Sequence, residues 1–194
     1  MRLFLLARHG QSTLNVERRI NGDPAVDVPL TADGTANALR LAAEIAALPV
    51  ELGVHTRFAR TRRTLEIALG KRGVPLLELP LLDDVRVGEL EGCTIEEYRA
   101  WKQGRPSSDP FPGGESLDDA ARRYAEGYEQ LLARPERVVL VVCHEIAVRY
   151  AVNGAAGSTT LDGPLHDVPN ALPYLFDEES LARAVDGIRH AAAA

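Results

Sequence analysis

Residues 138–143 are Val-Val-Leu-Val-Val-Cys, an unbroken apolar run that decides the fold. Four of the six residues are the β-branched Val, and such a run is typical of a strand that a parallel sheet buries on both faces. Leu3–Ala7 is a second short apolar run, and a glycine follows it at position 10. The two runs therefore predict two buried strands.

Helical patterns alternate with further strand candidates along the chain. Thr31 precedes a helical pattern that Pro49 stops, and Arg57–Leu69 carries another that ends at Gly70. Ser116 begins a helix that runs to about Ala133. The remaining expected elements are strands at Leu52–Thr56, Val74–Leu79 and Leu172–Phe176, a helix at Ile146–Asn153 and a C-terminal helix.

This alternation predicts an α/β fold, a three-layer sandwich with a mostly parallel central sheet covered by helices on both faces. We expect residues 1–194 to form a single domain, because a chain of this size can bury one sizeable core. Thr94 begins a short helix through Trp101, and the loop Gly104–Gly114 follows it. These features predict a short lid-like excursion around residues 94–115.

Composition excludes several classes of function. The net charge is −6, which argues against a nucleic-acid or anionic-membrane partner, since both need clustered basic residues. No apolar run approaches the roughly 20 residues that span a bilayer, and Leu3–Ala7 is too short for a signal core. The two cysteines, Cys93 and Cys143, cannot form a disulfide framework, so a cytoplasmic location is expected.

Polar residues follow three of the predicted strands. Arg8 and His9 follow the first, an Arg-rich segment follows Leu52–Thr56, and His144 follows the run at 138–143. In a parallel sheet these ends meet at the edge where ligands bind. Neutral imidazole is a nucleophile near pH 7, and fixed guanidinium groups offset the charge of a phosphoryl group, so the pattern indicates anion chemistry.

Other interpretations of these histidines remain open. A histidine at a strand end can simply hydrogen-bond a neighbouring carbonyl. Two histidines with a carboxylate can also bind a metal ion, but Arg8 beside them disfavours a second cation. The sequence contains neither a P-loop nor a Gly-x-Ser-x-Gly nucleophile elbow.

Arg8–Asn15, which begins Arg-His-Gly, resembles the signature of the histidine phosphatase superfamily in its phosphoglycerate-mutase-like branch. The similarity continues in order along the chain to about residue 176. The further matching segments are residues 19–23, 27–34, 56–64, 82–92, 113–116 and 141–144.

The resemblance implies a reaction through a phosphohistidine, with no metal ion or other cofactor. His9 is the implied nucleophile. The implied ligands of the phosphoryl oxygens are Arg8, Arg60 and His144, with Asn15 as a neutral donor. The position of the proton donor carries Asp84, where this branch normally has Glu, and Asp83 and Glu89 are close enough in sequence to compete with it.

A second departure from the family follows His144. Many relatives have Gly at the next position, whereas this chain has Glu145. A carboxylate there would repel a phosphate unless it points away or pairs with an arginine such as Arg149. We expect Glu145 to point away.

The resemblance favours a compact phosphatase that hydrolyses a small phosphorylated metabolite. Only the short Gly104–Gly114 loop is available as a lid, and Leu14 stands where mutases typically have Trp. A phosphoglycerate-type phosphomutase and a non-catalytic module that binds a phosphorylated ligand are the alternatives. The substrate and the oligomeric state are not predicted.

Overall fold

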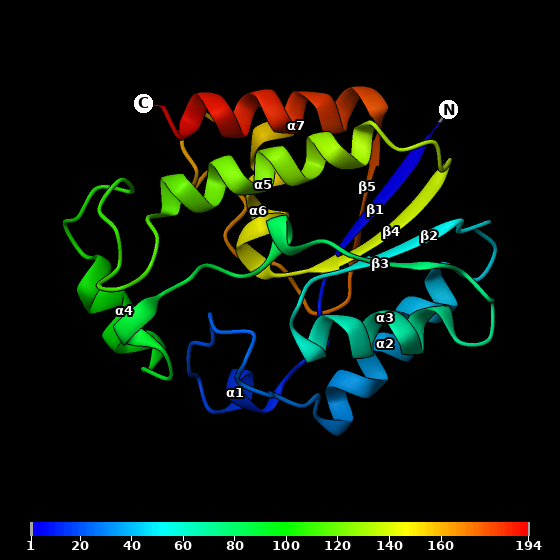
Figure 1. Ribbon diagram of the computed structural model, residues 1–194, viewed down its shortest axis with the longest axis horizontal. Coiled ribbons are helices and arrows are strands. Elements are labelled where there is room, and N and C mark those ends of the chain that lie inside the picture. Colours follow the sequence, from blue (N-terminus) through cyan, green and yellow to red (C-terminus); the bar gives the residue numbers. More distant parts are fainter. Residues whose placement is uncertain (1, 194) are drawn as a thin grey trace.

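A five-stranded sheet forms the centre of the computed structural model, which describes residues 2–193 (Figure 1). Its strands, in the spatial order β3-β2-β4-β1-β5, are β3 (Leu76–Glu78), β2 (Leu52–His55), β4 (Val138–Cys143), β1 (Leu3–Arg8) and β5 (Pro173–Asp177). Only β5, at one edge, pairs antiparallel. The mostly parallel sheet is therefore confirmed.

The two apolar runs lie side by side at the middle of this sheet. β1 pairs parallel with β4, with Leu3 opposite Val138 and Arg8 opposite Cys143. Successive side chains alternate between the two faces, so Phe4 contributes to one hydrophobic core and Leu5 to the other. Because the strands end in register, the residues that follow them meet at one edge.

Helices cover both faces of the sheet. In Figure 1, α5 (Leu117–Leu132), α6 (Glu145–Ala155) and α7 (Glu178–Ala191) lie above it, and α2 (Ala32–Glu44) and α3 (Ala59–Leu69) lie below it. Each group closes its own buried apolar cluster against the strands. This arrangement is the expected three-layer sandwich.

Several predicted helix ends agree with the structure, but α2 ends at Glu44, five residues before the Pro49 at which its pattern was expected to stop. Thr31 caps α2 by accepting a hydrogen bond from the Gly34 amide at 3.0 Å. Gly70 ends α3 with a positive φ of 54°, a conformation that suits glycine. The single-turn helix α1 (Thr13–Val16), capped by Ser12, was not predicted, because one turn is too short to show a period.

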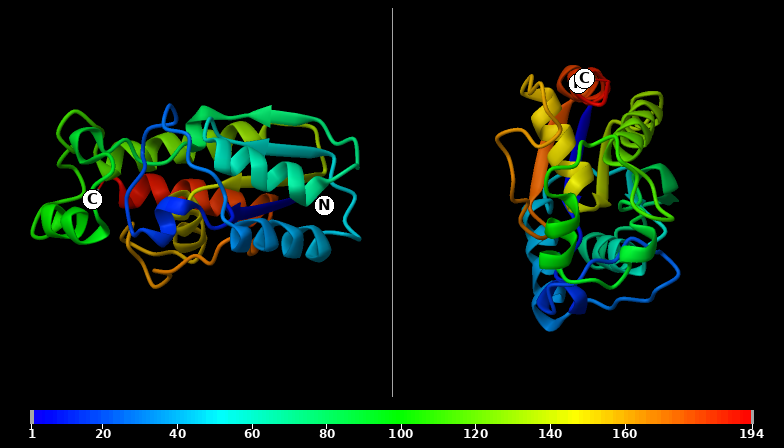
Figure 2. Two further views of the ribbon diagram at one scale, coloured as in Figure 1. Left: turned by 90° about the horizontal axis from the view of Figure 1, so that it is seen from below. Right: turned by 90° about the vertical axis from the view of Figure 1, so that its left-hand side faces the viewer.

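The segment from residue 79 to residue 115 crosses from β3 to α5. It contains two 3₁₀ turns, η1 (Pro80–Leu82) and η2 (Gly88–Leu90), and the helix α4 (Ile95–Lys102). The left view of Figure 2 places α4 and its flanking loops at one end of the molecule. Phe111 anchors this excursion, because its buried ring lies 4.5 Å from that of Trp101 and belongs to the main core cluster. Within residues 2–193, no helix is long and apolar enough to cross a bilayer.

Candidate active site

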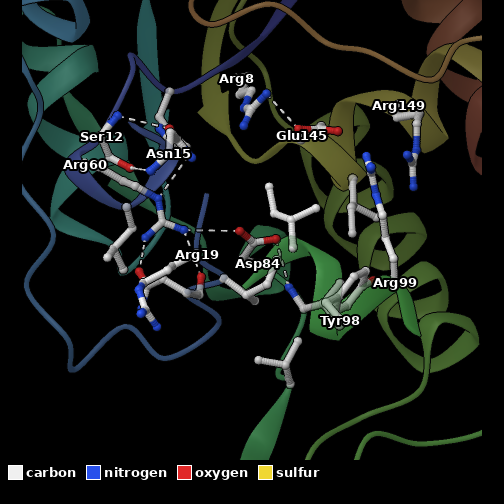
Figure 3. A pocket seen from close by; sticks show the side chains of 18 of the residues that line it. Arg8, Ser12, Asn15, Arg19, Arg60, Asp84, Tyr98, Arg99, Glu145 and Arg149 are labelled. Atoms are coloured by element: carbon white, nitrogen blue, oxygen red, sulfur yellow. Dashed lines mark hydrogen bonds and ion pairs between the residues drawn. The ribbon is translucent and has the colours of Figure 1, made fainter. Parts of the chain in front are cut away.

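A cavity of about 440 Å³ opens where β1, β2 and β4 end (Figure 3). Residues at or beyond the ends of all three strands line it: Arg8 ends β1 and His9 follows it, Arg60 lies beyond β2, and Glu145 lies beyond β4. The loop before η2 contributes Asp84 to the same cavity. This is the sheet edge at which the sequence predicts a ligand site.

His9 is buried with one ring nitrogen directed to an arginine. Its Nδ1 lies 2.7 Å from the Gly10 carbonyl oxygen, which can only accept a hydrogen bond, so Nδ1 carries the proton. Nε2 therefore presents its lone pair, and the Nε–H of Arg60 donates to it over 3.0 Å. Burial, followed by the charge of Arg60, lowers the pKa of His9 well below its usual value. The imidazole is thus neutral at pH 7, as a nucleophile must be.

Arg60 lies in the first turn of α3, and its guanidinium hydrogen-bonds to residues from several segments of the site. Besides His9, it donates to the Asn21 carbonyl oxygen at 3.1 Å and to Asp84 Oδ2 at 3.1 Å. Burial lowers the pKa of Arg60, and the carboxylate of Asp84 opposes this shift. An arginine keeps its charge under such a shift, so the site holds a fixed, oriented cation.

Asp84 and His144 form the far side of the site. Asp84 Oδ2 lies 3.2 Å from Nδ1 of His144, which is fully buried. Burial raises the pKa of Asp84, but His144 and Arg60 outweigh it and leave this pKa well below its usual value. Burial lowers the pKa of His144, so the neutral ring faces an ionised carboxylate.

Asn15 lines the cavity, and the oxygen of its side-chain amide is hydrogen-bonded within the chain. Its Oδ1 accepts from the Ser12 amide at 3.0 Å, in the capping box of α1. Since the oxygen is engaged, the Nδ2 amide group is left to donate to an anion. The structure thus places Asn15 at the cavity, and its role as a neutral donor stays a prediction.

Arg8 is the one predicted phosphate ligand that contacts a carboxylate outside the predicted set. Its Nη1 lies 2.7 Å from Glu145 Oε2 and donates to the Val168 carbonyl oxygen at 3.1 Å. The prediction that Glu145 points away is therefore wrong. Glu145 follows β4 at the start of α6, which brings its side chain beside the end of β1, so the carboxylate meets Arg8.

Known proteins resemble this chain over most of its length. The sequence model of the histidine phosphatase superfamily (branch 1) matches residues 4–177. This chain belongs to that superfamily. The 2,3-bisphosphoglycerate-dependent phosphoglycerate mutase 2 of Gloeobacter violaceus is 33% identical over 167 residues, which cover 77% of this chain and 73% of the relative.

Solved structures share the fold of this superfamily member. Bacillus stearothermophilus YhfR superposes with a TM-score of 0.73 at 25% identity, covering 90% of each chain. The alpha-ribazole phosphatase of Shigella flexneri superposes with a TM-score of 0.76 at 20% identity, also covering 90% of each chain. At this identity, the second likeness concerns the fold alone.

The structure brings together the six residues that the histidine phosphatase signature implied. Five of them line the cavity, and His144 lies directly behind Arg60 and Asp84. Those five are Arg8, His9, Asn15, Arg60 and Asp84. Their catalytic roles stay predictions.

The two competing carboxylates lie elsewhere. Asp83 is buried against Arg57, with 2.6 Å between the carboxylate and Nε. Glu89 is not among the residues that line the cavity. Of the three candidate proton donors, Asp84 alone reaches the site.

Several supporting residues were not predicted. Thr64 Oγ1 accepts from the Gly10 amide at 2.9 Å and Asn170 Nδ2 donates to the His9 carbonyl at 2.7 Å, so both fix the loop that carries the nucleophile. Thr56 Oγ1 lies 2.9 Å from Nε2 of His144. Glu91 accepts from Asn21, which itself holds Arg60. Asn21 and Glu91 both stand in motif segments, which is a signal that could have indicated them.

The outer half of the cavity is made by the segment after α1, by α4 and α6, and by the loop that follows α6. It carries exposed or half-buried charges: Arg19, Arg99, Lys102, Arg149, Asp162 and Asp167. Asp162 lies between two of the cations, 3.0 Å from Lys102 and 3.2 Å from Arg149. Among residues 2–193, no three His, Cys, Asp or Glu side chains gather in a group that could hold a metal ion.

Proposed function

We propose that this protein hydrolyses phosphomonoesters of small metabolites through a phosphohistidine on His9. The observation that carries the proposal is the state of that ring. The Gly10 carbonyl holds the proton on Nδ1, and the lone pair of Nε2 accepts a hydrogen bond from the Nε–H of Arg60 over 3.0 Å. A phosphoryl group bound by Arg60 is thereby held against the nucleophile.

In the first step, the lone pair of His9 Nε2 forms a bond to phosphorus as the ester oxygen–phosphorus bond breaks. Arg8, Arg60 and Asn15 bind the phosphoryl oxygens and offset the charge that develops on them. His144 lies buried behind Arg60 and also stabilises the charge on these oxygens. The Gly10 carbonyl stabilises the positive charge that the phosphorylated ring acquires at Nδ1.

The leaving oxygen takes a proton from Asp84. In the structure this carboxylate is ionised, since Arg60 and His144 hold it. A dianionic phosphoryl group draws both partners to itself and adds a negative charge nearby, and both effects raise the pKa of Asp84. As the substrate binds, Asp84 therefore takes up a proton from solvent, and it transfers this proton to the leaving oxygen as the ester bond breaks.

In the second step, water attacks the phosphohistidine. Asp84, now ionised, accepts a proton from the water as the oxygen–phosphorus bond forms and the nitrogen–phosphorus bond breaks. The products are inorganic phosphate and His9 in its starting state. No step needs a metal ion or another cofactor.

A phosphomutase is the second candidate, because a curated relative at 33% identity bears that name. The two functions share the first step and differ in the acceptor of the phosphoryl group. Water discharges His9 in a hydrolase, whereas a second substrate molecule discharges it in a mutase. The short lid around α4 favours access of water.

The proposed partner is a small phosphorylated molecule, not a nucleic acid or a membrane. The net charge of −6 supports this choice. A cytoplasmic location is proposed on the two free cysteines, one of them buried in the core. The proposal leaves the oligomeric state open.

Phosphate release from an aryl phosphomonoester between about pH 5 and pH 8, with a chelator present, tests the proposal. We expect turnover that survives the chelator and disappears in His9→Ala. Reaction in ¹⁸O-labelled water should place the label in the released phosphate. Loss of turnover on chelation would contradict the metal-free mechanism, and transfer only to an added acceptor would establish the mutase.

A further inference from the structure

Glu145 holds the position on Arg8 that a phosphoryl oxygen would need. The two side chains are 2.7 Å apart and only 19% and 33% exposed, and the other contact of Arg8 Nη1 is the Val168 carbonyl. Nε of Arg8 is buried and has no hydrogen-bond partner within residues 2–193. The guanidinium is thus partly engaged by a carboxylate and partly unsatisfied.

A bound phosphoryl group and Glu145 compete for the same cation. If phosphate binds Arg8 as the proposed function requires, two negative groups meet at one guanidinium, and their repulsion disfavours this arrangement. Glu145 then has to leave Arg8. Its side chain stands at the first position of α6 and is 33% exposed.

Arg149 lies one helical turn further along α6, on the same face as Glu145. Its Nη2 contacts Asp162 and its Nη1 donates to the His166 carbonyl oxygen. Its Nε is buried and, within residues 2–193, has no hydrogen-bond partner. Figure 3 shows Glu145 between Arg8 and Arg149. The chain therefore offers a second arginine with an unsatisfied donor at the distance that a glutamate spans along a helix.

We propose that Glu145 exchanges Arg8 for Arg149 when a phosphoryl group binds. This inference rests on the proposed function and assigns the residue a role in it. As an internal competitor at Arg8, Glu145 weakens the binding of inorganic phosphate, the product. It thereby hastens product release without taking part in the bond-making steps.

Titration of inorganic phosphate into the protein, followed by calorimetry, tests the exchange. Glu145→Gln keeps the shape of the side chain and removes its charge, so phosphate should bind roughly three- to tenfold more tightly. Inhibition of turnover by phosphate should strengthen by the same factor. Asp167→Asn removes a charge elsewhere on the cavity wall, and we expect its affinity for phosphate to stay within about twofold of the wild type.

Arg149→Met tests the second partner. In the wild-type background it should weaken phosphate binding several-fold, because the displaced Glu145 then has no cation to receive it. In the Glu145→Gln background the same substitution should change the affinity less than about twofold. In nuclear magnetic resonance spectra of the wild type, the Nε–H resonances of Arg8 and Arg149 should both shift on addition of phosphate. In Glu145→Gln, only the resonance of Arg8 should shift.

Two results would overturn the exchange while leaving the phosphoryl site intact. One is equal or weaker phosphate binding in Glu145→Gln, and the other is an equal effect of Arg149→Met in both backgrounds. A different result would bear on the proposed function itself. If neither the wild type nor Glu145→Gln binds phosphate, the proposed phosphoryl site is wrong, and the exchange falls with it.

Discussion

The inner and outer halves of the cavity are built differently. The inner half consists of His9, Arg60, Asp84 and His144, whose polar atoms contact one another or the backbone at strand and helix ends. The outer half consists of longer charged side chains after α1, on α4 and α6 and in the loop after α6, among which Asp162 pairs with Lys102 and Arg149. Both halves contain arginine and carboxylate groups.

Burial makes these similar groups behave differently. In the inner half, low dielectric and fixed partners shift the pKa values of both histidines and of Asp84. In the outer half, water and salt screen the pairs, and an exposed pair contributes little. The inner half is therefore suited to chemistry, and the outer half to contacts that can change with the substrate.

Replacement of the nucleophile should have the largest effect. His9→Ala removes the lone pair that attacks phosphorus, so turnover should fall by more than about 10³-fold. His190→Ala, an exposed histidine on α7, is the matched control and should keep wild-type turnover. Steady-state release of phosphate measures both variants, and residual activity near wild type in His9→Ala would contradict the inner site.

Arg60→Lys should have the next largest effect. Lysine keeps the charge but cannot reach His9, Asp84 and the Asn21 carbonyl at once, as the planar guanidinium does. We expect kcat/KM to fall roughly 10²- to 10³-fold. Arg63→Lys, an exposed neighbour that pairs with Glu66, should change it little. Equal effects of the two substitutions would remove the distinction between a fixed and a screened arginine.

Asp84→Asn should separate substrates by their leaving groups. An alkyl phosphate needs a proton on its leaving oxygen, so its kcat/KM should fall roughly 10²-fold or more, whereas an aryl phosphate should lose less. Glu89→Gln is the control, since Glu89 is not among the residues lining the cavity. A uniform loss across leaving groups would assign Asp84 a structural role.

The inner histidines should also make stability depend on pH. Both have folded-state pKa values below the unfolded value of about 6.5, so the unfolded chain binds more protons as the pH falls below that value. The free energy of unfolding should therefore decrease from about pH 6.5 to pH 5, by at most about 1.4 kcal/mol per pH unit for each histidine. Chemical denaturation of the wild type and His9→Ala measures this, and the slope should be smaller in the variant. Equal slopes would place the pH dependence elsewhere.

Removal of an ion pair in the outer half should have the smallest effect, and this effect is on the free energy of unfolding. Lys102→Met removes a pair in which the two side chains are 27% and 54% exposed, so the free energy of unfolding should change by less than about 1 kcal/mol. The loss should shrink further at high salt. Denaturation at low and high ionic strength measures it, and a large, salt-independent loss would mean that the outer half is as fixed as the inner half.

Sequence patterns could predict the layers of the fold and most of the inner site. The run at 138–143 and its counterpart in β1 are apolar on both faces, and parallel pairing then forces His9 and His144 to one edge. The predicted roles of His9 and Arg60 came from the resemblance of the Arg-His-Gly segment and of the segment around Arg60 to the superfamily. These features are local in sequence, and regular geometry brings them together.

The contacts of Glu145 could not be predicted in this way. Which arginine it meets depends on how α6 leaves β4 relative to the end of β1, and no pattern within α6 carries that information. The hydroxyl of Thr56 behind His144 is a similar case, because the two residues are 88 positions apart. Side-chain partners between distant segments follow from the packed structure.

The central claim is tested most directly by trapping the phosphorylated protein. A rapid mix with an aryl phosphomonoester, an alkaline quench and mass spectrometry of the digest would locate the phosphoryl group, and nuclear magnetic resonance would identify the nitrogen that bears it. The account predicts one phosphoryl group on Nε2 of His9, absent in His9→Ala. A phosphoryl group on another residue, or turnover without any phosphorylated protein, would contradict it.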